Sequence, residues 1–229
     1  MKYLSNYLKF DESIDNQFFK TKDEIVEWLN KIHIRNYTIN DDLTVDTHDD
    51  EVNITHMKLD CIPVQFNIVK GIFYCNNNNL KSLKGSPRYL IPSKYRTAFY
   101  CYENKLTSLE YCTADIEYEL VCSNNNIINL KGFPNVKEFD IGENPVNRLI
   151  DRIQILISDR KFELKKREFI YHLNDFDVIQ GNNIFLDKLE EVIDLMGFNF
   201  DFKESDKIST NLLGFSNVWF EKLGYKIIE

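Results

Sequence analysis

An eleven-residue pattern recurs five times between residues 52 and 149. In its clearest copy, Phe73 and Cys75 alternate with polar or outward positions, and Asn78, Leu80 and Leu83 follow at fixed spacing. Three further copies keep the apolar positions and the Asn: Phe99, Cys101, Asn104, Leu106 and Leu109; Leu120, Cys122, Asn125, Ile127 and Leu130; Phe139, Ile141, Asn144, Val146 and Leu149. A degenerate first copy has Met57 in place of the Asn and consists of Val52, Ile54, Leu59 and Ile62.

The pattern matches the leucine-rich-repeat signature L-x-x-L-x-L-x-x-N/C-x-L, in which each copy supplies one short strand. The copies begin at residues 52, 73, 99, 120 and 139, so the steps are 21, 26, 21 and 19 residues. These steps lie inside or beside the range of 20–29 residues for this class. The sequence therefore predicts an α/β solenoid, an irregular leucine-rich repeat whose strands form a parallel sheet.

The recurring Asn has a structural interpretation. After each strand the chain must turn sharply, and the bend leaves backbone donors and acceptors without partners. An Asn side chain has both a donor and an acceptor, so it can satisfy the turn above and the turn below. We therefore expect Asn78, Asn104, Asn125 and Asn144 to form a ladder inside the solenoid.

The connectors between copies contain turn residues such as Lys84-Gly85-Ser86-Pro87 and Lys131-Gly132-Phe133-Pro134. The connector over residues 86–96 is longer and carries Arg88, Tyr89 and Arg96. It is interpreted either as a second contact surface or as variation in length without a role, and we favour variation in length.

The chain resembles the short leucine-rich-repeat proteins of large AT-rich bacteriophages over roughly residues 21–150. The resemblance is carried by Trp28-Leu29, Asn36 to Asp46, Ile62 to Phe66, Phe73 to Cys75, Leu80 to Gly85 and Leu106 to Leu109. It implies the repeat fold and a phage or bacterial origin, but no reaction, because members of this family mostly have no assigned activity. The chain departs from the regular members in its uneven repeat lengths and its missing first Asn.

The two ends are predicted to cover the solenoid, because an open end would expose core and unpaired strand edge. Residues 1–46 form an N-terminal cap, with a helix expected at about residues 22–33. Thr21 and Glu24 have the spacing of a capping box. Ile25, Trp28 and Leu29 then follow on one helical face, and short strands are expected at residues 37–40 and 43–46.

Residues 47–149 hold the five repeats, and residues 150–229 are predicted to be a helical cap or a small separate domain. Three helices are expected there, and Gly197 would end the third. A last helical turn is expected at Trp219, Phe220 and Leu223, before a strand over residues 225–228.

Charge and hydropathy argue against several functional classes. Net charge is −8, and nucleic-acid binding needs a positive surface, so no nucleic-acid partner is expected. No apolar run reaches the roughly 18 residues of a membrane helix, and no targeting segment is evident, so we expect a cytoplasmic protein without a membrane partner.

Metal and catalytic sites are not expected. Cys75, Cys101 and Cys122 repeat with the strands, so we interpret them as small buried apolar residues rather than zinc ligands. Cys61 and Cys112 have no His at a catalytic spacing. The segment that holds His48, Asp49, Asp50 and His56 is interpreted as an acidic loop, although hard-metal binding is conceivable. No metal, cofactor or catalytic residue is predicted.

The outward positions of the sheet are the best candidate for a binding surface, because repeat proteins bind partners on their concave face. They are Asn53, Ile72, Tyr74, Ala98, Tyr100, Tyr102, Glu119, Val121, Glu138 and Asp140. The predicted protein-binding residues are Tyr74, Tyr100, Tyr102, Glu119, Val121, Glu138 and Asp140. Tyr is frequent at interaction hot spots, whereas the alternative is that these rings only pack across strands.

Three functions remain open. The first is a non-enzymatic protein-interaction module that binds a host or phage protein. The second is a structural or assembly protein whose C-terminal helical part makes oligomers or attaches to a particle. The third, which we favour least, is an enzyme with its active centre in the C-terminal part.

Overall fold

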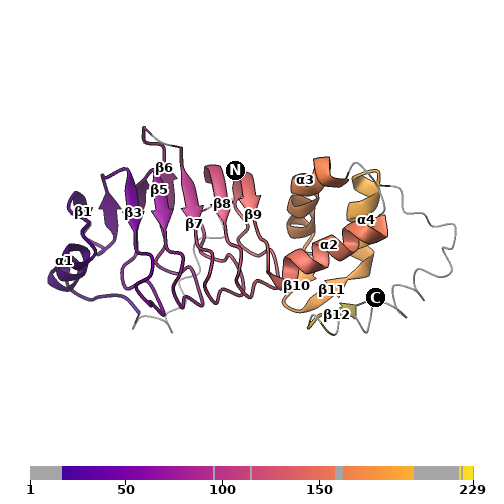
Figure 1. The fold of residues 1–229 in the computed structure, drawn as a ribbon, viewed down its shortest axis with the longest axis horizontal. Coiled ribbons are helices and arrows are strands. Elements are labelled where there is room, and N and C mark those ends of the chain that lie inside the picture. The colour runs from indigo at the N-terminus through magenta and orange to yellow at the C-terminus, as the bar shows by residue number, and fades with distance from the viewer. Residues whose placement is uncertain are drawn as a thin grey trace.

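The chain forms a row of parallel strands between two helical ends, as the computed structural model shows (Figure 1). The structure describes residues 17–94, 96–113, 115–157, 162–198, 222 and 224–228. In Figure 1 the single helix α1 lies at one end of the row, and helices α2, α3 and α4 lie beyond β9 at the other.

The main sheet has five parallel strands in the order β3-β5-β7-β8-β9. The strands are β3 (Glu51–Asn53), β5 (Ile72–Tyr74), β7 (Ala98–Tyr100), β8 (Asp115–Val121) and β9 (Asn135–Asp140). Equivalent positions of the repeat lie side by side, so that Val52, Phe73, Phe99, Leu120 and Phe139 form one row. The first four of these are fully buried, which confirms the predicted parallel-sheet solenoid.

The Asn ladder stabilises the turns after the strands. The Nδ2 group of Asn104 donates to Cys75 O at 3.0 Å in the preceding turn and to Cys101 O at 3.1 Å in its own turn. Its Oδ1 accepts the Leu80 N–H at 3.0 Å. Asn78, Asn125 and Asn144 make equivalent bonds.

One detail of the prediction is wrong: each Asn binds its own turn and the preceding turn, not the turns on both sides. Because each Asn bonds to the preceding turn, the first copy of the pattern has less need of one. Met57 occupies the Asn position in this copy, and no earlier copy precedes it. Its N–H instead donates to Asn78 Oδ1 at 3.0 Å.

The residue before each ladder position has a positive φ, which the sequence pattern did not suggest. The angles are 55° at His56, 57° at Asn77, 52° at Glu103, 53° at Asn124 and 56° at Glu143. This left-handed conformation costs most residues about 1–2 kcal/mol. The ladder bonds on either side of it hold the bend in this conformation.

The connectors form a second, short ribbon of strands that leads directly into the main sheet, because only Gly71 separates β4 from β5. Strand β4 (Ile68–Lys70) pairs in parallel with β6 (Tyr89–Ile91), and β2 (Val45–Thr47) continues the ribbon through a bridge between Val45 and Phe66. Strand β1 (Tyr37–Ile39) pairs antiparallel with β2. The connector over residues 86–96 thus contains a strand, β6, that the sequence pattern did not indicate.

At the N-terminal end, helix α1 spans Lys22–Lys31 and has the expected capping box between Thr21 and Glu24. It ends earlier than residue 33, because Ile32 is its C-cap and His33 has a φ of 63°. The helix buries Ile25 and Leu29, and the Trp28 ring lies 6.3 Å from the Phe66 ring, centroid to centroid.

The C-terminal part combines helices with a small sheet. The helices are α2 (Pro145–Ile157), α3 (Phe162–Asp175) and α4 (Leu186–Leu195). Strand β11 (Asn183–Phe185) lies between β10 (Ile179–Gln180) and β12 (Lys226–Ile228). Of these strands, only the last was expected, and the helical turn expected at Trp219, Phe220 and Leu223 lies outside the described residues. Helix α2 starts inside the fifth repeat copy, four residues before Leu149.

The C-terminal part packs directly on the solenoid. The hydroxyl of Tyr171 on α3 accepts the Val136 N–H at 2.9 Å and lies 3.1 Å from Val136 O. The Tyr225 hydroxyl donates to Ile128 O at 2.7 Å. Buried side chains of both parts belong to one continuous core cluster. Among the described residues, no helix has the length and apolar character needed to cross a membrane.

Candidate protein-interaction surface

The side of the main sheet that faces away from the core, here called the open face, consists of two rows of outward residues. Strand register defines both rows. The first row contains Glu51, Ile72, Ala98, Glu119 and Glu138. The second row contains Asn53, Tyr74, Tyr100, Val121 and Asp140.

The centre of the open face is an aromatic pair. Tyr74 and Tyr100 are direct neighbours in the second row, and their rings stack with centroids 4.9 Å apart and planes 9° apart. This separation equals the spacing of adjacent strands, about 4.7–4.9 Å, so the sheet itself sets the stack. The Tyr100 hydroxyl also donates a hydrogen bond to Glu119 Oε2 at 2.6 Å, and this bond links the ring to the next strand, β8.

The ten ladder positions of the open face carry only negative charge. They include Glu51, Glu119, Glu138 and Asp140 but no Lys or Arg. Beside them, Arg96 and Lys137 lie over the ring of Tyr118, the residue before Glu119 on β8. None of these four carboxylates has an ion pair with another described residue. Partial burial, together with the negative charge of Glu51, raises the pKa of Tyr74. Burial and the hydrogen bond to Glu119 raise the pKa of Tyr100 well above its usual range.

The structure brings most of the predicted binding residues together on this face. Tyr74, Tyr100, Glu119 and Val121 are partly exposed, whereas Glu138 and Asp140 are exposed. Tyr102 lies just after the second row, in the bend that follows β7, and it is partly exposed.

Two positions differ from the prediction. Ala98 was expected to point outward as part of the surface, but it is 3% exposed because its short side chain lies between Ile72 and Glu119 in the first row. Glu51 was missed. It directly precedes the first apolar residue of the degenerate copy, so the alternation of the repeat could have placed it outward.

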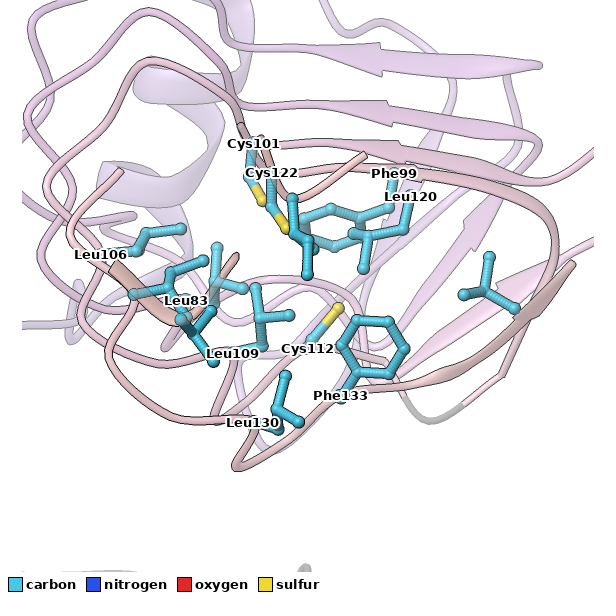
Figure 2. Close-up of a cluster of buried hydrophobic side chains, with 14 of the residues drawn as sticks. Leu83, Phe99, Cys101, Leu106, Leu109, Cys112, Leu120, Cys122, Leu130 and Phe133 are labelled. Atoms are coloured by element: carbon cyan, nitrogen blue, oxygen red, sulfur yellow. The ribbon is translucent and has the colours of Figure 1, made fainter. Parts of the chain in front are cut away.

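The thiols lie in a different environment. Cys75, Cys101, Cys112 and Cys122 are buried, and Figure 2 shows the last three with their sulfur atoms in the core beside Phe99, Leu120 and Phe133. Burial raises the pKa of Cys75, Cys101 and Cys112 well above the ordinary value for a thiol. These groups therefore remain protonated, as the interpretation of the strand cysteines as small apolar residues expects.

The acidic segment before the first repeat uses its carboxylates locally. Asp46 accepts from Asn67 Nδ2 at 2.7 Å and from the Ile68 N–H at 3.1 Å. Asp50 pairs with Lys94 at 3.0 Å. Across the ranges that the structure describes, no three His, Cys, Asp or Glu side chains form a group suited to a metal ion.

A hollow lies where the solenoid meets α3. It is an open groove of about 390 Å³, and its apolar lining includes Leu90, Ile116 and Val136. Charged residues of both signs, including Glu117 and Arg167, also line it. The groove is small and of mixed charge, whereas the ten ladder positions of the open face span five strands and carry negative charge only.

Comparisons with protein-family models, with curated proteins and with solved structures find no match to this chain.

Proposed function

We propose that the chain is a non-enzymatic leucine-rich-repeat module that binds another protein through its open face. The observation that carries this proposal is the stacked pair of Tyr74 and Tyr100 on a sheet face whose ten ladder positions include four carboxylates and no basic residue. Rigid aromatic side chains contribute much contact area at little entropic cost, which makes them frequent anchors in protein interfaces.

The leucine-rich-repeat assignment is supported by the ladder geometry. The repeated Asn binds backbone groups of successive turns, and the steps of 21, 26, 21 and 19 residues stay near the range of that class. In such arrays each repeat contacts its neighbours and presents a continuous surface, so residues from different repeats contribute to one binding site.

The proposed partner has a positively charged and partly apolar surface. The four carboxylates of the open face would repel an acidic partner and attract a basic one, and they would also speed its association at low salt. The tyrosines would supply the apolar contact at the centre.

Site-specific photo-crosslinking tests the proposal. A photoreactive phenylalanine analogue replaces Tyr74 on the open face or, as a matched control, Tyr89 on β6, which is 57% exposed and lies outside the five-stranded sheet. In cells that express the gene, the Tyr74 variant is expected to give one discrete adduct that the Tyr89 variant does not give. Equal adducts from both positions, or none from either, would refute the proposal.

A second candidate is an assembly role for the C-terminal part, the alternative that the sequence left open. It is favoured by two exposed apolar side chains, Leu164 at 89% and Leu195 at 58%. If these residues mediate association, the purified chain forms oligomers, and the double substitution L164K/L195K returns it to the monomer mass in light scattering. A monomeric wild-type chain at high concentration would eliminate this candidate.

A further inference from the structure

We propose that the open face contains a subsite for an arginine side chain of the partner, located above Val121 between Tyr100 and Asp140. This inference rests on the proposed function, because it names the chemistry that the same face recognises. It follows from the register of the second row, the short side chain at its fourth position and the charges around that position.

The second row has a vacant stacking position. Tyr74 and Tyr100 stack at 4.9 Å, the spacing between their strands, so a third planar group in the same series would lie above the next strand, β8. The residue at that place is Val121, which is partly exposed and too short to fill the height of a tyrosine ring. The outer face of the Tyr100 ring therefore borders an unfilled position that is about one strand spacing wide.

Three carboxylates surround the vacant position. Glu119 lies two residues before Val121 on the same strand, Glu138 pairs with Glu119, and Asp140 pairs with Val121. Each retains acceptor capacity: Glu119 uses Oε2 for the Tyr100 hydroxyl, and Asp140 uses Oδ1 for the Gly142 N–H at 2.8 Å. Among the described residues, no basic side chain forms an ion pair with them. Lys137, which precedes Glu138, lies over the Tyr118 ring instead.

These two features together fit a planar cation better than a spherical one. A guanidinium group is flat, stacks on aromatic rings and presents five N–H donors in its plane, so it can contact Tyr100 with its face and the carboxylates with its edge. A lysine ammonium group would meet the same charges but could not continue the stack. The geometry thus points to arginine rather than to positive charge alone.

Nuclear magnetic resonance titration of the full-length chain tests the subsite with three small probes. The probes are N-acetyl-arginine amide, N-acetyl-lysine amide and N-acetyl-citrulline amide, the last being planar but uncharged. The arginine probe is expected to shift the Val121 and Asp140 amide signals in a saturable manner. It should bind about threefold or more tightly than the lysine probe, because only the guanidinium gains the ring contact. The citrulline probe should produce no saturable shift.

Matched variants locate the binding. V121F fills the vacant position with a strand-forming aromatic residue, so the fold is retained and arginine binding should be lost. Y100F keeps the ring but releases Glu119 from its hydrogen bond, and it should bind at least as tightly as the wild type. Y100L removes the ring and should abolish the preference for arginine over lysine. Y89L, in the separate two-stranded sheet of β4 and β6, should leave all titrations unchanged.

The outcomes separate the two proposals. If arginine and lysine probes bind equally and V121F has no effect, or if neither probe binds, the subsite is refuted, while the crosslinking test of the open face stands on its own result. If the arginine probe binds as expected but Tyr74 gives no specific adduct in cells, the subsite exists without the proposed partner function. Circular dichroism confirms that each variant is folded.

Discussion

At the residue scale, one Asn side chain per turn supplies the hydrogen bonds that the backbone of the bend needs. Asn104 satisfies backbone groups on Leu80, Cys75 and Cys101 with a single amide, and it is itself buried. Because buried backbone groups need hydrogen-bond partners, the ladder residues are structural, and the surface residues beside them are available for binding.

Asn104→Ala tests the ladder. The substitution leaves several buried backbone groups unpaired, and each such group costs about 1–3 kcal/mol, so we expect a loss of about 3 kcal/mol or more in the free energy of unfolding. Urea denaturation measures the loss. Asn53→Ala is the control, because the Asn53 side chain bonds to Thr55 in an exposed turn and its removal should cost less than about 1 kcal/mol.

The five thiols should differ sharply in reactivity. Cys61 is exposed and the other four are buried, so an aromatic disulfide reagent should modify one thiol in the native chain and five in denaturant. Partial burial and the negative charge of Asp60 raise the pKa of Cys61, so less thiolate is present at neutral pH and the native reaction should accelerate as pH rises. Native modification of two or more thiols would contradict the buried arrangement, and Cys61→Ser should abolish the native reaction.

At the element scale, the connectors are as constrained as the strands. The turn at Gly132 has a φ of 80°, and a Cβ at this position would lie 2.2 Å from Leu109 O of the preceding connector. The turn at Gly85 is similar, because a Cβ there would lie 2.7 Å from Val64 O. Both glycines allow one turn to stack closely on the previous one, which explains why the connectors pack as regularly as the repeats.

Gly132→Ala should therefore cost more than its backbone angle alone. A residue other than glycine at positive φ costs about 1–2 kcal/mol, and the clash with the Leu109 carbonyl adds to that cost. Gly197→Ala provides the comparison, because Gly197 also has a positive φ, 62°, but a Cβ there would meet no described atom within 4 Å. Thermal unfolding should show the larger loss for Gly132→Ala, and equal losses would mean that the connector adjusts freely.

At the scale of the whole molecule, the C-terminal part covers the last strand of the solenoid. Strand β9 is the final strand of the main sheet, and side chains from α3 contact its backbone: Tyr171 at Val136 and Arg167 at Lys137 O, 3.3 Å away. A free strand edge invites pairing with other chains, so this contact both anchors α3 and protects the edge.

Tyr171→Phe should loosen this junction without removing its apolar contact. The Val136 N–H loses its acceptor, so its hydrogen exchange should become faster, and the free energy of unfolding should fall by about 1–3 kcal/mol. Tyr225→Phe is the control at the same junction, because it removes the bond to Ile128 O and should leave Val136 exchange unchanged. Unchanged exchange in Tyr171→Phe would show that the contact does not protect β9.

The amino-acid sequence by itself determined the repeated strand, its alternation and the positions of the recurring Asn, because these depend on residues close together in the chain. Which neighbouring turn each Asn binds depended on contacts across about 20 residues or more and was not determined. The alternation of Phe73, Tyr74 and Cys75 fixes which side chains enter the core, whatever the rest of the molecule does. The same alternation placed Tyr74, Tyr100 and Glu119 on one face before their contacts were known.

Only the tertiary structure decided the features that depend on neighbouring turns. The burial of Ala98, the pairing of β4 with β6 and the placing of Val121 directly beside Tyr100 each require the lateral register of separate repeats. The strand β12 joins β11 from about 40 residues further along the chain, a distance over which local sequence preference carries no information. The physical reason is the same throughout: short-range patterns set the direction of each side chain, whereas its neighbours are set by packing between distant segments.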